Sequence, residues 1–311
     1  MSARAPAAEA PAGLPPVVEI ERRSDPMVAF GWVTLAMVLF AILAAGSRKA
    51  ALMGYDPLQI VFLRNFSALI LMLPLLAWRG LSLCRSSSMG LYGVRVLISL
   101  VSMTSWFYAL ALIPMGEVTA IGFLSPLFGT LSAIVFLGEK VRLRRWTALA
   151  IGFVGAMIIL RPGASSLGLG QACALVSAVA GGTIGALLKH LTSSDDPDKI
   201  VFITTAMMTP MSLVPALFVW RMPGMDLLPV LAVIAVTGVL GHAALMRAFR
   251  AAEASLIATF EFSRLPFVVV IGYWMFGELI DMWTWIGAAI IFASAAYITR
   301  REAKLRREGR R

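Results

Sequence analysis

A heptapeptide that occurs twice constrains this chain more than any other feature. Residues 56–62 read Asp-Pro-Leu-Gln-Ile-Val-Phe, and residues 196–202 read Asp-Pro-Asp-Lys-Ile-Val-Phe, so five of seven positions match at an offset of 140. The Gly-Glu dipeptide that ends at Glu139 recurs at Glu278, at an offset of 139. In a chain of 311 residues, a repeat of this length indicates two similar halves.

The composition indicates that these halves are embedded in lipid. The chain is 59% hydrophobic and 14% charged, whereas an average soluble domain is about 25% charged. Most of the apolar segments approach the ~20 residues that a helix needs to cross a bilayer, and they are continuous rather than alternating, which argues against a barrel. The predicted transmembrane helices are residues 27–47, 57–78, 89–112, 115–137, 146–160, 170–188, 197–220, 227–248, 252–276 and 282–299.

The basic residues predict the orientation of these helices. If the N-terminus is cytoplasmic, the inner connections and tails hold 20 Lys and Arg residues and the outer connections hold 4. This is the positive-inside pattern, and it places both termini in the cytoplasm of a multi-pass inner-membrane protein. Residues 1–26 lack the apolar core of a signal peptide and are expected to be a disordered cytoplasmic tail, while residues 301–311 form a basic cytoplasmic tail.

The number of helices in each half determines how the halves are related. Five helices are expected in residues 27–161 and five in residues 162–300. Because five is odd, the second half enters the membrane from the opposite side. The predicted fold is therefore an all-α integral membrane protein, with ten transmembrane helices as two inverted five-helix repeats around a central cavity. Secondary transporters use this arrangement, because the two halves can exchange conformations.

Matched motifs in the two halves resemble a known family. Leu-Gly-Glu at residues 137–139 and Phe-Gly-Glu at residues 276–278 end the fourth and ninth segments, and Pro126 and Pro266 precede them by about a dozen residues. Together with the ten segments, these features resemble the EamA-type permeases of the drug/metabolite transporter superfamily. The resemblance implies transport of a small metabolite by alternating access, and exporters of amino acids, including aromatic ones, look most similar. A multidrug or nucleotide/sugar-type carrier of the same fold is the alternative.

Charged and polar residues at membrane depth are the first candidates for substrate binding. Arg64 and Asn65 lie within the second segment, and Arg264 lies near the middle of the ninth. Glu261 precedes Arg264 by three residues, so the two share a helix face and can pair. The pair can neutralise itself and only stabilise the bundle, or an arginine can meet a substrate carboxylate. Arg95 lies near a segment end and is expected to snorkel towards the interface.

Prolines, aromatic residues and a histidine complete the candidate binding set. Pro126 and Pro266 each remove a helix hydrogen bond at matched places, which marks either a simple kink or the cavity. The other candidates can stack on a substrate ring or titrate near neutral pH, although such residues also serve as plain packing; they are Trp106, Tyr108, Phe123 and His242. Glu139 and Glu278 are expected to have a shared structural role at helix ends.

Several classes of function are disfavoured by what the sequence lacks. It has no metalloprotease, nucleophile-elbow or phosphate-loop motif, and Cys84 and Cys173 alone cannot hold zinc, so no enzyme activity, metal or cofactor is expected. An intramembrane enzyme or sensor would need a catalytic pair at matched depth. The expected partners are a small-molecule substrate and membrane lipid, without nucleic acid. The sequence does not decide whether transport is coupled to protons, is facilitated export or is an exchange. It also leaves the oligomeric state open, and a monomer is compatible with the sequence.

Overall fold

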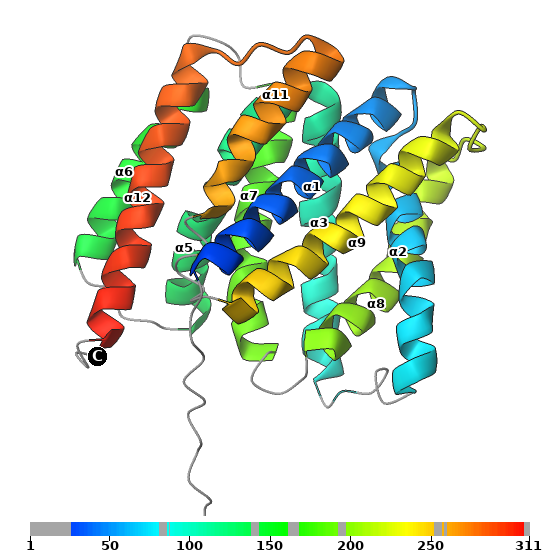
Figure 1. Cartoon of the computed structure of the whole chain (residues 1–311), viewed down its shortest axis with the longest axis horizontal. Coiled ribbons are helices and arrows are strands. Elements are labelled where there is room, and N and C mark those ends of the chain that lie inside the picture. Colours follow the sequence, from blue (N-terminus) through cyan, green and yellow to red (C-terminus); the bar gives the residue numbers. More distant parts are fainter. Residues whose placement is uncertain are drawn as a thin grey trace, which may run out of the picture.

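The structure is a bundle of helices (Figure 1). It is a computed structural model that describes residues 26–80, 86, 88–137, 143–160, 168–191, 197–251, 257 and 260–307, so the expected disordered tail lies outside the described residues. Every regular element in these ranges is helical. The elements are α1 (Pro26–Leu52), α2 (Pro57–Arg79), α3 (Met89–Leu112), α4 (Met115–Gly122), α5 (Ser125–Leu137), α6 (Leu143–Leu160), α7 (Leu169–Leu191), α8 (Pro197–Phe218), α9 (Leu227–Ala251), the 3₁₀ turn η2 (Glu261–Ser263), α11 (Arg264–Phe276) and α12 (Met282–Arg307).

Local sequence explains where several helices begin and end. Asp56 caps α2, because its Oδ1 accepts a hydrogen bond from Leu58 N at 2.8 Å, and Pro57 occupies the first helical position, where no N–H is needed. Gly277 ends α11 in the left-handed region, with a φ of 68°, which a residue without Cβ adopts at little cost. The Asp-Pro dipeptide of the first half and the Gly-Glu dipeptide of the second half therefore mark a helix start and a helix end.

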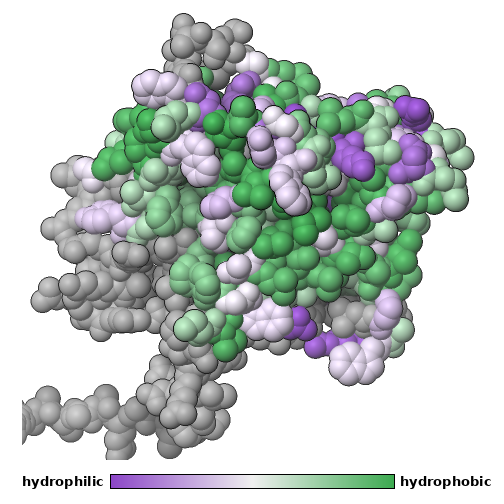
Figure 2. Space-filling model, turned by 45° about the horizontal axis from the view of Figure 1, so that its top comes forward, coloured by the Kyte–Doolittle hydropathy of each residue, from purple (hydrophilic) through white to green (hydrophobic). Residues whose placement is uncertain are grey.

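The surface of the bundle is that of a protein in lipid. Five helices in the described part are long and apolar enough to cross a membrane, namely those covering residues 27–52, 57–74, 89–112, 199–218 and 227–248, and α6, α7 and α12 contain shorter apolar stretches. In Figure 2, hydrophobic side chains cover the middle of the visible face, and hydrophilic ones gather towards its upper and lower edges. Trp78 and Phe218, at the ends of α2 and α8, are 82% and 86% exposed, as interfacial aromatic residues are.

Helices from the two ends of the chain pack against one another. The most extensive contacts join α1 with α9 and α3 with α7, followed by α6 with α12, α5 with α7, α2 with α8 and α1 with α11. Figure 1 shows α1 and α9 side by side and running in opposite directions. Four of these six pairs bring together segments that are more than 100 residues apart in the sequence. The two pairs that include α7 join segments closer in sequence.

A stripe of small residues on α7 brings the backbones of α7 and α5 close together. Ala174 and Ala178 are almost fully buried. A Cβ built on Gly182 would lie 2.5 Å from Gly129 N and 2.5 Å from Ser125 O, both backbone atoms of α5. The two helices can approach this closely only because Gly182 has no side chain, which is the packing mode expected where lipid supplies no hydrophobic driving force.

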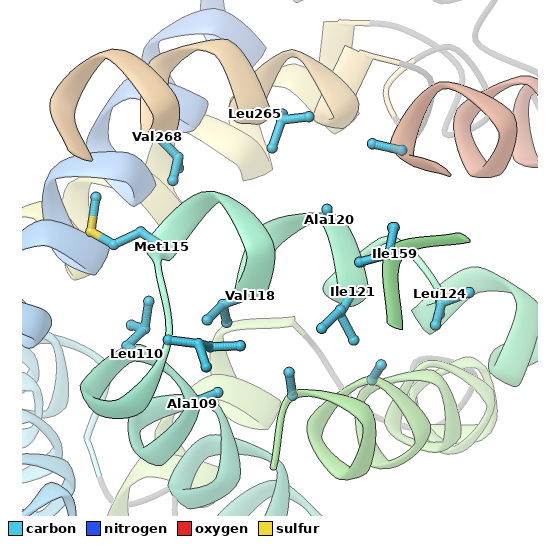
Figure 3. Packing of buried hydrophobic residues seen from close by; sticks show 14 of the residues in the cluster. Ala109, Leu110, Met115, Val118, Ala120, Ile121, Leu124, Ile159, Leu265 and Val268 are labelled. Atoms are coloured by element: carbon cyan, nitrogen blue, oxygen red, sulfur yellow. The ribbon is translucent and has the colours of Figure 1, made fainter. Parts of the chain in front are cut away.

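The short helix α4 lies at the centre of the main hydrophobic core. Figure 3 shows it between α11, which contributes Leu265 and Val268, and α3, which contributes Leu110, with Ile159 of α6 near its far end. Six of the eight residues of α4 are buried, so the helix is covered on all sides. A helix that is apolar around its whole circumference belongs in a core.

Two segments expected to be continuous helices are interrupted. Residues 115–137 form α4 and α5, with the break at Phe123 and Leu124, and residues 260–276 comprise η2 followed by α11. The reason is that Pro126 and Pro266 lack an N–H and cannot donate to the carbonyls of Gly122 and Phe262, four residues earlier. Each proline instead lies in the first turn of the helix that follows the break, where a missing N–H costs nothing.

An ion pair between Arg48 and Glu278 joins the helix ends on one side of the bundle. Arg48 Nε contacts Glu278 Oε1, and its Nη1 donates to the carbonyls of Leu110 at 2.5 Å and Ile113 at 2.8 Å. Glu278 Oε2 accepts a hydrogen bond from Met115 N at 2.8 Å. The expected structural role of Glu278 as a bond to a neighbouring helix end is thus confirmed, whereas Glu139 lies outside the described residues.

A second set of polar contacts ties the α1–α2 connection to the α8–α9 connection. Gln59 Nε2 donates to Arg221 O at 2.5 Å, and Arg221 N donates to Gln59 Oε1 at 3.1 Å. Tyr55 Oη accepts from Gly224 N at 2.9 Å, and the Arg221 guanidinium lies 5.2 Å from the Tyr55 ring centre. The segment containing the first repeated heptapeptide is therefore held by the backbone that follows the second one.

The contact between α5 and α7 generates a stability prediction. Gly182→Ala must push the two backbones apart, so it is expected to lower the free energy of unfolding by about 1–3 kcal/mol. The matched control is Gly31→Ala on α1, where nothing lies within 4 Å of the added Cβ and the better helix propensity of alanine leaves stability equal or slightly higher. Thermal unfolding of the purified protein in detergent measures both, and equal melting temperatures for the two variants would contradict the close approach.

The buried ion pair generates a second prediction. Glu278→Gln keeps an acceptor for Met115 N but leaves the Arg48 charge without its partner, so a loss of about 3–5 kcal/mol is expected. In the double variant, Arg48→Met with Glu278→Gln, no buried charge remains, and the combined loss should be clearly smaller than the sum of the two single losses. The melting temperatures of the unaltered protein, the two single variants and the double variant check this. If the two single losses add up to the loss in the double variant, the two side chains are not coupled.

Candidate functional site

The two helix breaks meet inside the bundle. Phe123, at the end of α4, lies with its ring centre 4.4 Å from that of Phe262 in η2, and Phe262 lies 4.9 Å from Phe292 of α12. The carbonyls of Gly122 and Phe262 are the two that Pro126 and Pro266 cannot satisfy. Aromatic rings and helix-break carbonyls from distant parts of the sequence are thus gathered in one place, at the face of α4 that packs on α11.

The second break also carries the predicted charged pair. Glu261 lies in η2 and Arg264 begins α11, and both side chains are partly buried. Their opposite charges interact. They do not form an ion pair, because among the described residues only Arg48 and Glu278 have an N···O distance below 4.0 Å. Glu261 and Arg264 therefore compensate each other electrostatically across the turn without forming a direct bond.

Arg64 and Asn65 of α2 form a polar group with the neighbouring helices. Arg64 Nη1 donates to Asn65 Oδ1 at 3.3 Å and to Met103 Sδ of α3 at 3.4 Å. Asn65 Nδ2 donates to Ser212 Oγ of α8 at 3.4 Å, and both of these residues are buried. A Cβ built on Gly238 of α9 would lie 3.8 Å from Arg64 Nη2, so the guanidinium points inward between α3 and α9.

His242 lies one turn after Gly238 on α9, near the same polar group. Its Nδ1 is 2.7 Å from Gly238 O, and its ring meets that of Phe40 on α1 edge to face, with centres 5.0 Å apart. Phe40 packs against a buried cluster, mainly of α1 and α9 residues, against which Phe260 and Phe267, on either side of η2, also pack. The histidine is thus hydrogen-bonded to its own helix and shares its surroundings with the second break only through this cluster.

The two aromatic candidates on α3 have different surroundings. Trp106 packs against both large hydrophobic clusters, the one around α4 and the one between α1, α2 and α9. It therefore lies between the Arg64 group and the helix breaks. Tyr108 instead donates from Oη to Asp56 Oδ1 at 2.9 Å. It therefore lies beside the connection between α1 and α2 and not at the helix breaks.

Some candidates point elsewhere than the sequence suggests. Pro126 and Pro266 are exposed, so their side chains do not line the interior, and they affect it only through the helix breaks that they cause. The expectation that Arg95 snorkels is wrong, because its Nη1 donates to Thr204 Oγ1 on α8. Phe262 was missed by the sequence reasoning, although its position 140 residues after Gly122 was a usable signal.

These residues offer charge, hydrogen bonds and aromatic faces. Among the described residues, no three His, Cys, Asp or Glu side chains come together as a metal site would require. What the arrangement can do is hold an organic solute: the rings of Phe123 and Phe262 supply apolar contact, and Arg64, Asn65, Glu261 and Arg264 supply polar contact on either side of Trp106.

Comparison with known proteins gives the same kind of molecule. The chain is 32% identical to a riboflavin transporter of Vibrio cholerae, over 93% of this chain and 98% of the relative. It is 26% identical to an S-adenosylmethionine uptake transporter of Rickettsia bellii, over 89% and 95%, and 26% identical to a pseudopaline exporter of Pseudomonas aeruginosa, over 86% and 94%. A solved crystal structure of 16% identity has a similar fold, with a TM-score of 0.59 over 88% of this chain and 98% of the other.

A family model matches nearly all of the described bundle. The EamA-like transporter family matches twice, over residues 27–161 and again over residues 168–300. The relatives named above are small-molecule transporters from bacteria. With a family match over most of its length, this chain belongs to the EamA-like transporter family of membrane transporters.

Proposed function

We propose that this chain is a secondary transporter whose two halves, residues 27–161 and 162–300, are inverted five-helix repeats. The double match of one family model supports two related halves. The helix contacts support a two-fold relation between them. A two-fold relation would exchange α1 with α7, α2 with α8, α3 with α9, α4–α5 with η2–α11, and α6 with α12. Under this exchange, the contact of α1 with α9 becomes the contact of α7 with α3. The contact of α5 with α7 likewise becomes that of α11 with α1, and the pairs α2–α8 and α6–α12 map onto themselves.

The observation that carries the proposal is the meeting of the two helix breaks. Gly122 and Phe262, whose carbonyls cannot accept from the prolines four residues later, are separated by the repeat distance of 140 residues. Their breaks lie at the same place in each half and contact each other through Phe123 and Phe262. Interrupted helices at matched positions are what transporters use to bind substrate near the middle of the membrane. Rocking of the halves around this point would expose it to each side in turn.

The basic residues support the orientation of the carrier. Their excess in the connections that would face inward favours an inner-membrane protein with both termini in the cytoplasm. Relatives of this chain include uptake transporters and an exporter, so either direction of movement fits the family. A carrier of this kind moves its substrate and does not transform it.

Riboflavin is the first substrate to test. It is the named cargo of the relative that is 32% identical over nearly the whole chain. Riboflavin and S-adenosylmethionine, the cargo of another relative, share a fused heteroaromatic ring attached to a polar chain. The ring faces of Phe123, Phe262 and Phe292 suit such a ring, and the polar side chains around them suit the chain.

Amino acids, including aromatic ones, are the second candidate. The Glu261 and Arg264 side chains present opposite charges on neighbouring turns, which matches the ammonium and carboxylate of a zwitterion. S-adenosylmethionine also contains such a group. A carrier that recognises both parts of that molecule could move amino acids, and the experiment below includes one.

Transport by reconstituted protein tests the proposal. Proteoliposomes containing the full chain are expected to take up labelled riboflavin faster than protein-free liposomes, and assays with and without a pH gradient establish whether protons are coupled. Labelled tryptophan serves as the second solute in both assays. Phe123→Ala or Phe262→Ala should raise the half-saturating concentration about tenfold, because a ring contact is lost.

The matched control for these variants is Phe66→Ala on α2, a phenylalanine that is 45% exposed on the outside of the bundle. It should transport like the unaltered protein. Equal losses in Phe66→Ala and Phe123→Ala would exclude the helix breaks as the site. Absence of uptake for both solutes would overturn the substrate assignment.

A further inference from the structure

Arg64 has weaker partners than the other arginines that lie within the described bundle. Arg48 is paired with Glu278, Arg264 is compensated by Glu261, and Arg95 donates to the Thr204 hydroxyl. No carboxylate of the described residues lies within ion-pair distance of Arg64, and its two contacts, to Asn65 and Met103, are 3.3 and 3.4 Å long. A cation held at membrane depth without a counter-charge is costly, which marks it as a functional group rather than a structural one.

The geometry of the guanidinium shows which of its edges is available. Nη1 is occupied by the two long contacts to Asn65 and Met103. Nε and Nη2, which point their N–H bonds in the same direction, donate to no residue in the part of the chain that the structure describes. This edge faces Gly238, where an added Cβ would lie 3.9 Å from Nε and 3.8 Å from Nη2. Residue 238 has no side chain, so no Cβ stands in front of this edge; Leu43 Cδ1 lies 3.0 Å from the position that a Cβ would take.

Two parallel N–H donors select a particular kind of ligand. They match two acceptor atoms side by side, such as the oxygens of a carboxylate or a ring nitrogen beside a carbonyl. Arginine reads guanine through such an acceptor pair, while adenine presents a donor next to an acceptor and is read by Asn or Gln. The flavin ring has two edges of the first type, N1 with the C2 carbonyl and N5 with the C4 carbonyl.

We propose that the Nε–Nη2 edge of Arg64 recognises a pair of adjacent acceptors on the substrate, and that this contact selects flavin-like or carboxylate-bearing solutes over solutes that carry adenine and no carboxylate. The inference rests on the proposed function, because it requires that a solute enters the bundle. It assigns the selectivity to one side chain.

Binding of matched analogues to the full-length protein in nanodiscs tests the assignment. The flavin probes are riboflavin, 1-deazariboflavin and 5-deazariboflavin, in which one ring nitrogen is replaced by C–H. The carboxylate probes are tryptophan and tryptophan amide, and adenosine, which carries adenine and no carboxylate, is measured beside them and should bind more weakly than riboflavin. One deaza analogue should bind about tenfold more weakly than riboflavin, because it lacks one of the two acceptors. Isothermal titration gives the dissociation constants.

Substitutions at the two facing positions connect the effect to Arg64. Arg64→Lys keeps the charge but loses the fork of donors, so riboflavin should bind as weakly as the poorer deaza analogue and the difference between the analogues should disappear. Gly238→Val fills the space in front of the edge and should have the same effect. Arg95→Lys is the matched control and should leave the selectivity unchanged. Thermal unfolding of each variant establishes that it is folded.

The outcomes separate the two proposals. A deaza penalty that disappears in Arg64→Lys supports a flavin as the source of the acceptor pair. If riboflavin does not bind, but tryptophan binds more tightly than its amide and only in the presence of Arg64, the acceptor pair is a carboxylate and the riboflavin assignment fails alone. If riboflavin binds and Arg64→Lys leaves the analogue preferences intact, this inference fails while the transporter proposal stands. If no probe binds, this inference and both substrate assignments are overturned.

Discussion

A backbone carbonyl without a donor cannot be left facing lipid, and this constraint organises the centre of the molecule. Pro126 and Pro266 each remove the usual helical donor of one carbonyl, that of Gly122 and that of Phe262, and the Phe262 carbonyl accepts from Arg264 N inside the bundle instead. The interruptions they cause therefore have to lie inside the bundle, covered by other helices. The burial of nearly all of α4 is the result, since this helix ends at the first break and is surrounded by α3, α6 and α11.

Much of the architecture follows from patterns that are local in the sequence. The repeated heptapeptide, the apolar segments, the matched prolines and the small residues of α7 each rest on spacings of a few residues, and the structure has helices, breaks and close packing at those places. The same reasoning expected continuous helices through Phe123, because apolar periodicity is insensitive to one lost hydrogen bond. It also expected Arg95 at the interface, because depth alone does not reveal a partner such as Thr204.

The contacts that define the candidate site could not be found in this way. Phe123 and Phe262 are 139 residues apart, and Arg48 and Glu278 are 230 apart, so their meeting depends on how the helices are arranged in three dimensions. The halves also differ where chemistry is concerned: at the repeat distance of 140, Arg264 corresponds to Leu124 and Arg64 to Thr204. A symmetric framework thus carries an asymmetric set of polar side chains, which is suited to a solute that has no symmetry of its own.

The two hydrogen bonds between Gln59 and the main chain of Arg221 have a consequence for how this sequence can change over evolutionary time. Both hydrogen bonds join the amide of Gln59 to the main chain of residue 221, and Tyr55 likewise accepts from the main chain of Gly224. These hydrogen bonds do not depend on the side chain at position 221, provided that the residue there keeps its N–H, and only the contact of the Arg221 guanidinium with the Tyr55 ring does. Substitutions at position 221 therefore leave the hydrogen bonds in place, whereas the amide at position 59 has few chemical equivalents and should tolerate little drift.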